Sequence, residues 1–63
     1  MTDSEIEVVE AMGKWGGGFV QALAEAFRRA DLHNFRALRV AFPEYWTKYS
    51  EVARKAKREG SSS

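Results

Sequence analysis

Residues 14–31, KWGGGFVQALAEAFRRAD, place three adjacent glycines directly before the most regular helical pattern in the chain. Beyond the glycines, apolar residues recur at the spacing of one helix face, while charged and amide side chains occupy the opposite face. The frequent alanines favour a helix and let a neighbouring helix approach closely. We therefore predict a helix over residues 18–30 and expect the fold to be built on it. Its inward residues are Phe19, Val20, Leu23, Ala24, Phe27 and Ala30.

The glycines Gly16–Gly18 are compatible with three arrangements. They can separate two helices, so that a first helix folds back on the second with Trp15 and Phe19 flanking the bend. They can cradle a phosphate at a helix start, but a P-loop needs a preceding strand and a Gly-Lys-Ser/Thr ending, which this segment lacks. They can also lie within one continuous helix, at a cost of about 1 kcal/mol per glycine relative to alanine. We predict the helix break.

The segment before the glycines, TDSEIEVVEAM, begins with residues typical of a helix start. Thr2, Asp3 or Ser4 can accept hydrogen bonds from the free N–H groups of the first turn, and the nearby glutamates favour the positive end of the helix dipole. Val8 falls outside the face that the other apolar residues form, so a helix over residues 3–13 has a broad apolar face or packs against two neighbours. Those other residues are Ile6, Val9 and Met12 or Gly13.

Pro43 divides the rest of the chain into two further predicted helices. The residue before a proline avoids helical backbone, so a third helix over residues 34–42, capped by Asp31 or Asn34, ends there. Proline is also a favoured first residue, so a fourth helix covers residues 43–58 and stops before Gly60. The third helix has Phe35, Leu38 and Phe42 facing inward, and the fourth has Trp46, Tyr49, Val52 or Ala53, and Ala56.

The chain is therefore predicted to be all-α, a compact bundle of about four short helices. No segment alternates apolar and polar residues as a strand would. We expect one domain over residues 1–59 and a disordered tail over 60–63. A chain of 63 residues has little stability to spare, and it has no cysteine and one histidine, so neither a disulfide nor a metal centre can support it. We expect support from a partner, as a homodimer or on another protein.

Enzymatic activity is not expected. His33 and Asp31 lack a serine, a cysteine or a second histidine in a recognisable arrangement. Glu5 with Glu7 or Glu10 forms pairs of carboxylates, but these lie on the first helix, where they complement the helix dipole instead of forming a glycosidase pair. We predict no catalytic residue, no cofactor and no metal.

Large amphipathic aromatic side chains are the predicted partner-binding residues, because tryptophan and tyrosine dominate the energetics of protein interfaces. On the fourth helix, Tyr45 lies about 100° from the stripe that Trp46 and Tyr49 form, so it is expected to face outward or toward a partner. The candidates are Trp15, Tyr45, Trp46 and Tyr49.

The basic end of the fourth helix provides an alternative function, nucleic-acid binding. Phosphate contacts from it would give salt-sensitive binding that is blind to sequence. However, cations are favourable at any helix C-terminus, and the net charge of +1 is low for a dedicated nucleic-acid domain. The residues concerned are Lys48, Arg54, Lys55, Lys57 and Arg58.

The segment GGFVQALAEAFRRADLHNFRALRVAFPEYWTKY resembles short uncharacterised helical proteins encoded by phages and prophages. The likeness covers about residues 16–49 and consists of a Gly-Phe-Val-x-Ala-Leu-Ala start, an Ala-Asp junction and a Phe-Pro-Glu-x-Trp ending. It implies a small mobile-element protein that modulates or inhibits a host system by binding a protein, as anti-CRISPR proteins do. With an acidic start and no apolar run of about 18 residues, we expect a soluble protein in the bacterial cytoplasm, with no membrane partner.

Overall fold

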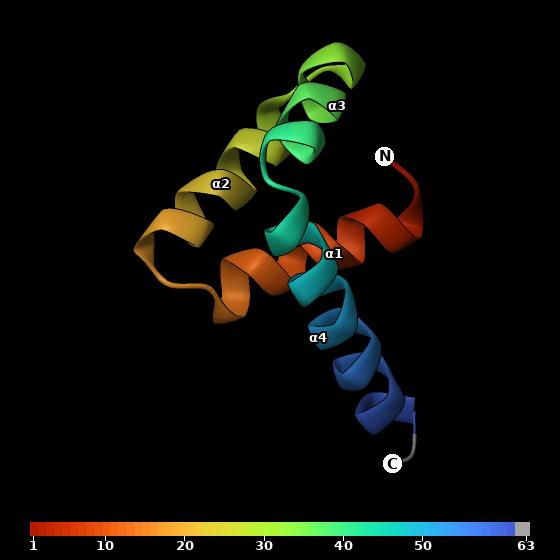
Figure 1. The fold of residues 1–63 in the computed structure, drawn as a ribbon. Helices are drawn as coiled ribbons and strands as arrows, with labels where there is room; N and C mark the ends of the chain where they lie inside the picture. Colours follow the sequence, from red (N-terminus) through yellow and green to blue (C-terminus); the bar gives the residue numbers. More distant parts are fainter. Residues whose placement is uncertain (62–63) are drawn as a thin grey trace.

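A computed structural model describes the backbone of residues 1–61 and the side chains of residues 1–57. This part of the chain forms helices and no strand, which confirms the predicted all-α class (Figure 1). The last helix continues past Gly60, at which a stop was predicted, and the remainder of the predicted tail, 62–63, lies outside the described residues. The helices are α1 (Asp3–Trp15), α2 (Gly18–Arg29), α3 (Leu32–Ala41) and α4 (Pro43–Ser61).

The starts of the helices use the capping residues that the sequence offers. At α1 the backbone N–H of Glu5 donates to Thr2 Oγ1 (3.2 Å) and the backbone N–H of Thr2 donates to Glu5 Oε1 (2.8 Å), so the two residues form a capping box. At α3 the backbone N–H of Asn34 donates to Asp31 Oδ1 at 2.8 Å. Thr2 and Asp31 are thus the caps among the predicted alternatives, and α3 begins two residues earlier than expected.

The glycines form the joint between α1 and α2, as predicted. Gly16 ends α1 and Gly17 caps α2, both with extended backbone (φ −77° and −73°). A Cβ at Gly16 would lie 2.5 Å from both the Met12 carbonyl oxygen and Val20 Cγ1, whereas at Gly17 or Gly18 it would meet nothing within 4 Å. Close approach of the two helices therefore requires a glycine at position 16 alone.

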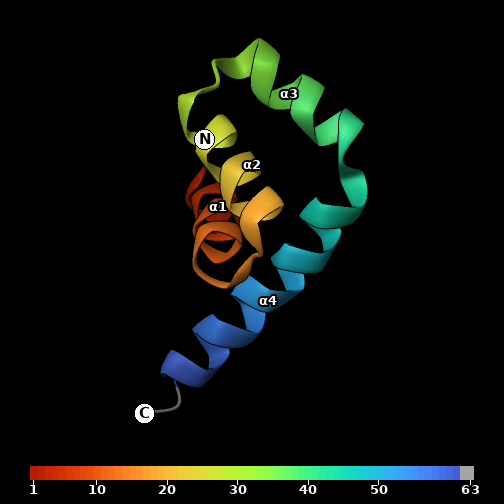
Figure 2. The same cartoon turned by 90° about the vertical axis from the view of Figure 1, so that its left-hand side faces the viewer.

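Helix α1 is the centre of the fold, so the expectation that α2 holds this place is wrong. It packs extensively against both α2 and α4, while α3 makes far fewer contacts with its neighbours (Figures 1 and 2). Val8 and Ala11 line grooves shared with α4, which explains why Val8 fell outside the predicted face. Ile6, predicted to face inward, is exposed instead. The buried residues of α1 are Val8, Val9, Ala11 and Met12.

A triad of buried aromatic rings joins the other three helices. Phe27 of α2, Phe35 of α3 and Trp46 of α4 contact one another with ring centroids 5.3 to 5.5 Å apart. Phe35 is the only fully buried residue among the ten of α3, and Leu38 is partly buried. Helix α3 is therefore attached mainly through one ring, and it spans the gap between the end of α2 and the start of α4 (Figure 2).

Candidate protein-interaction groove

The four aromatic residues predicted to bind a partner are divided between the surface and the core. Trp46 and Tyr49 are 8% and 5% exposed and belong to the core, so they present little surface to a partner in this fold. Trp15 is 50% exposed at the end of α1, where Lys14 Nζ lies 4.8 Å from the centroid of its ring. Tyr45 is partly buried. Trp46 and Tyr49 lie on the face of α4 that packs against the core, as their shared stripe predicted.

Phe19, predicted to be a core residue, is 57% exposed. Its ring lies against Phe42 and Tyr45 with centroid distances of 5.7 Å to each, and these two rings are 6.2 Å apart. We call Phe19, Phe42 and Tyr45 the aromatic surface cluster. Helical periodicity assigned Phe19 to the correct side of α2. It does not show, however, how far along α2 the neighbouring helices cover that side.

A groove of about 740 Å³ lies between the start of α1, the turn from α2 to α3, α3 itself and the start of α4. Its lining includes Phe35 of α3 and Trp46 of α4, which contact each other in the core. Leu32 and Val40 also line it and are 65% and 81% exposed, more than any other large apolar side chain among the described residues. We call this feature the α3 groove.

The positions of Leu32 and Val40 in the sequence indicate a second apolar face on α3. Leu32 and Val40 are large apolar residues that lie off the inward face of α3, the face formed by Phe35, Leu38 and Phe42. They are eight residues apart, so they share one side of the helix. Apolar residues left over after an inward face is assigned indicate a second apolar face.

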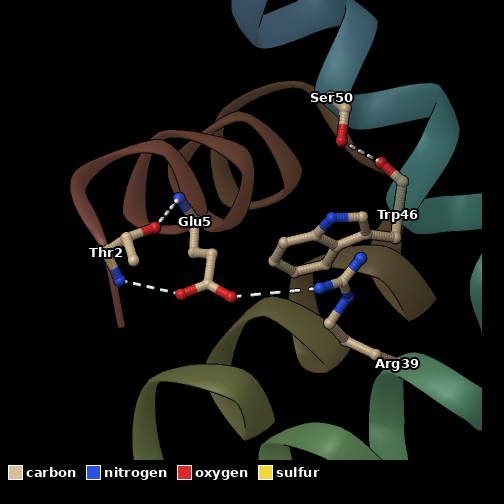
Figure 3. Close-up of polar contacts among 5 residues, drawn as sticks. All are labelled: Thr2, Glu5, Arg39, Trp46 and Ser50. Atoms are coloured by element: carbon tan, nitrogen blue, oxygen red, sulfur yellow. Dashed lines mark hydrogen bonds and ion pairs between the residues drawn. The ribbon is translucent and has the colours of Figure 1, made fainter.

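Arg39 crosses the groove beside Trp46. Its guanidinium carbon lies 4.4 Å from the centroid of the Trp46 ring, and its Nη1 lies 3.9 Å from Glu5 Oε2 (Figure 3). The hydrogen bond from the Thr2 backbone lowers the pKa of Glu5, and the positive charge of Arg39 adds to this effect. Glu5 is therefore ionised at neutral pH and is held by its own helix, which limits how closely it engages Arg39.

Acidic side chains lie beside several of the described basic residues proposed for nucleic-acid binding. Lys57 Nζ lies 3.3 Å from Glu7 Oε1, because acidic α1 runs alongside α4. Lys48 and Lys55 share a face of α4 with Glu51, which lies between them. Arg54 lines a groove together with Glu7. The side chain of Arg58 lies outside the described residues.

Within residues 1–57, no three histidine, cysteine, aspartate or glutamate side chains are grouped so that they could hold a metal ion. In the described part of the chain, no helix combines the length and the apolar character needed to cross a membrane. Neither a protein-family model, nor a curated protein, nor a solved structure matches the chain. The resemblance to phage-encoded proteins stays a prediction, and function has to be inferred from the surface itself.

Proposed function

We propose that the chain is a non-enzymatic protein-interaction module and that its partner binds in the α3 groove. The observation that carries this proposal is the position of Leu32 and Val40 on one groove whose lining includes Trp46. Burial of apolar surface is a main driving force of protein association. Exposed apolar side chains gathered at a concave surface are typical of interaction sites.

The fold itself does not account for these two side chains. Helix α3 is attached through Phe35, with Leu38 and Phe42 partly buried beside it, and Leu32 and Val40 add little to this packing. A polar residue at either position would leave the buried core unchanged. Their apolar character is explained if a partner covers them.

The dimensions of the groove suit a segment of polypeptide. Leu32 and Val40 are eight positions apart on α3, which corresponds to about 12 Å along the helix axis at 1.5 Å per residue. This length matches about two turns of a partner helix. If the chain is a phage-encoded modulator, as its resemblance predicts, that helix belongs to a host or phage protein. A second copy of the chain is the alternative occupant.

Site-specific photocrosslinking tests the proposal. A photoreactive amino acid replaces Val40 in one protein and, as the control, Ala26 on the exposed side of α2 in another. In extracts of the native host we expect position 40 to yield one dominant crosslinked protein and position 26 to yield none. Excess unlabelled wild-type chain should compete, whereas a folded Val40→Asp variant should not. A crosslink between two copies would identify the homodimer, and equal crosslinking from both positions would reject the groove as the binding site.

A further inference from the structure

We propose that the occupant of the α3 groove is an acidic amphipathic helix of the partner protein, an inference that rests on the proposed function. The charge of α3 is the first argument. This helix carries Arg36 and Arg39 and no acidic residue, and both arginines line the groove. The wall that α3 provides is therefore apolar and positively charged.

The two carboxylates in the groove lining are already engaged within the chain. Asp31 accepts the hydrogen bond that caps α3, and Glu5 accepts the hydrogen bond that closes the capping box of α1. Among the ion pairs of the described residues, none includes Arg36. The Thr47 hydroxyl donates to the Pro43 carbonyl and Arg39 lies beside Glu5, so Arg36 is the charged group of the lining without such a contact among the described residues. Its guanidinium pairs best with a carboxylate.

The spacing along α3 indicates how such a helix would lie. Leu32, Arg36 and Val40 follow one another at intervals of four residues and form one stripe. A partner helix along this stripe would place apolar anchors at i and i+7, about 10 Å apart, against Leu32 and Val40. An acidic residue one turn from either anchor would then face Arg36.

The contact between Arg39 and Glu5 provides a further test of an acidic partner. Arg39 Nη1 lies 3.9 Å from Glu5 Oε2, and both side chains line the groove. A carboxylate of the partner would compete with Glu5 for Arg39. Replacing Glu5 with glutamine removes the competing charge and keeps a side chain that can still accept in the capping box. The variant Glu5→Gln should therefore bind an acidic helix more tightly.

Fluorescence of Trp46, which lines the groove, provides the readout. Trp15 lies outside the groove, so the variant Trp15→Phe leaves Trp46 as the single reporter. The probe is a synthetic helical peptide of about four turns, with leucines at i, i+4 and i+7 and glutamates on the flanking positions. The control peptide has the same leucines, and lysine replaces every glutamate.

We expect saturable binding of the acidic peptide, weakened at least about fivefold by Arg36→Glu and strengthened about two- to threefold by Glu5→Gln. Lys55→Glu, which changes the net charge equally at an exposed position of α4 outside the groove, should leave the affinity within about twofold. Raising the salt concentration should weaken binding. Circular dichroism confirms that each variant is folded.

The outcomes separate this inference from the proposed function. Equal or tighter binding of the basic peptide would overturn the acidic specificity, while binding in the groove itself would stand. Failure of both peptides to bind, with a partner still crosslinked at position 40, would also overturn the inference and leave the proposed function in place. Failure of both peptides together with loss of the specific crosslink would overturn both.

Discussion

At the scale of single residues, the three consecutive glycines have unequal roles. Gly16 lies where α1 and α2 come closest, and a side chain there would collide with the Met12 carbonyl and Val20. Gly17 and Gly18 face open space, and none of the glycines in the described part of the chain has a positive φ. The amide of Gln21 donates to the Gly16 carbonyl at 3.0 Å and satisfies an acceptor at the end of α1. The bend thus depends on the absence of a side chain at one position.

Substitution of each glycine by alanine tests this difference. Gly16→Ala should reduce the free energy of unfolding by about 1–3 kcal/mol, because the new methyl group overpacks a tight contact. Gly18→Ala should be neutral or stabilising by up to about 1 kcal/mol, because alanine restricts the unfolded chain. At Gly17, the N-cap of α2, the weaker capping by alanine offsets this gain, so the net loss should stay below about 1 kcal/mol. Urea denaturation measures all three. Equal losses at the three positions would contradict the assignment of the close approach to Gly16.

The two tryptophans provide a second comparison at this scale. Trp46 packs against Phe27 and Phe35 in the core, so Trp46→Ala should reduce the free energy of unfolding by about 3–5 kcal/mol and unfold much of the protein. Trp15 is half exposed, so Trp15→Ala should cost less than about 1.5 kcal/mol. Thermal melts of the two variants measure the difference, and similar melting temperatures would show that the aromatic triad is not the anchor of the core.

At the scale of helices, α3 differs from the others in how little of it is buried. It is attached chiefly through Phe35, and it contributes both arginines and both highly exposed apolar side chains of the α3 groove. Elements with few buried contacts open more easily than the rest of a fold. The helix proposed to bind a partner is therefore also the helix that can adjust most readily to it.

Amide hydrogen exchange measures this local stability. We expect the amides of α3 to exchange by local opening at a lower free energy than those of α1, which packs against two helices. Phe35→Leu, which keeps an apolar side chain but removes the ring contacts, should accelerate exchange in α3 with a smaller effect on α1. Uniform protection of α1 and α3 would show instead that the four helices open as one unit.

The capping box makes the stability of α1 depend on pH. The pKa of Glu5 is lowered from its usual 4.5 in the folded protein, so its ionised form contributes stability that is present above that value and is lost as pH falls through the folded pKa. Relative to Glu5→Gln, the wild type should be more stable at neutral pH, and the difference should shrink as the pH falls below 4.5 and through the lowered pKa of Glu5. Melting temperatures across this range measure it; a difference that persists at low pH would exclude the charge as its source.

At the scale of the whole molecule, the uneven charge of the sequence becomes an internal contact. Acidic α1 lies along basic α4, and Glu7 pairs with Lys57 across 50 residues of chain. Part of the positive charge of α4 that could bind nucleic acid is thus paired with an acidic residue of α1. This arrangement reduces the basic surface available to nucleic acid, and it thereby adds to the case for the α3 groove as the binding site.

A charge swap tests this contact. Glu7→Lys should destabilise the fold by a few tenths of a kcal/mol, because the pair is exposed and the change places like charges together. Adding Lys57→Glu should recover part of the loss, and a double-mutant cycle isolates the coupling between the two residues. An additive double variant would show that the two charges do not interact in solution.

The sequence predicted the helices better than their arrangement. Caps, glycines and Pro43 are local signals, and they located the helix boundaries to within about three residues. Periodicity indicates which face of a helix is apolar but not which helix covers it, so the central position of α1 and the exposure of Phe19 were missed. The α3 groove was missed because four segments form it and periodicity does not show which segments meet. Leu32 also lay outside the predicted helix 34–42, so its relation to Val40 on one helix was not apparent.

The central position of α1 also bears on how the protein forms during translation. Helix α1 leaves the ribosome before α2, α3 and α4, yet α4 is one of its two main neighbours. Val8 and Ala11, which face α4, therefore stay uncovered until α4 has emerged. Contacts between distant segments form after local ones and close a long loop at an entropic cost. The nascent chain should consequently complete its native core only after α4 has been synthesised.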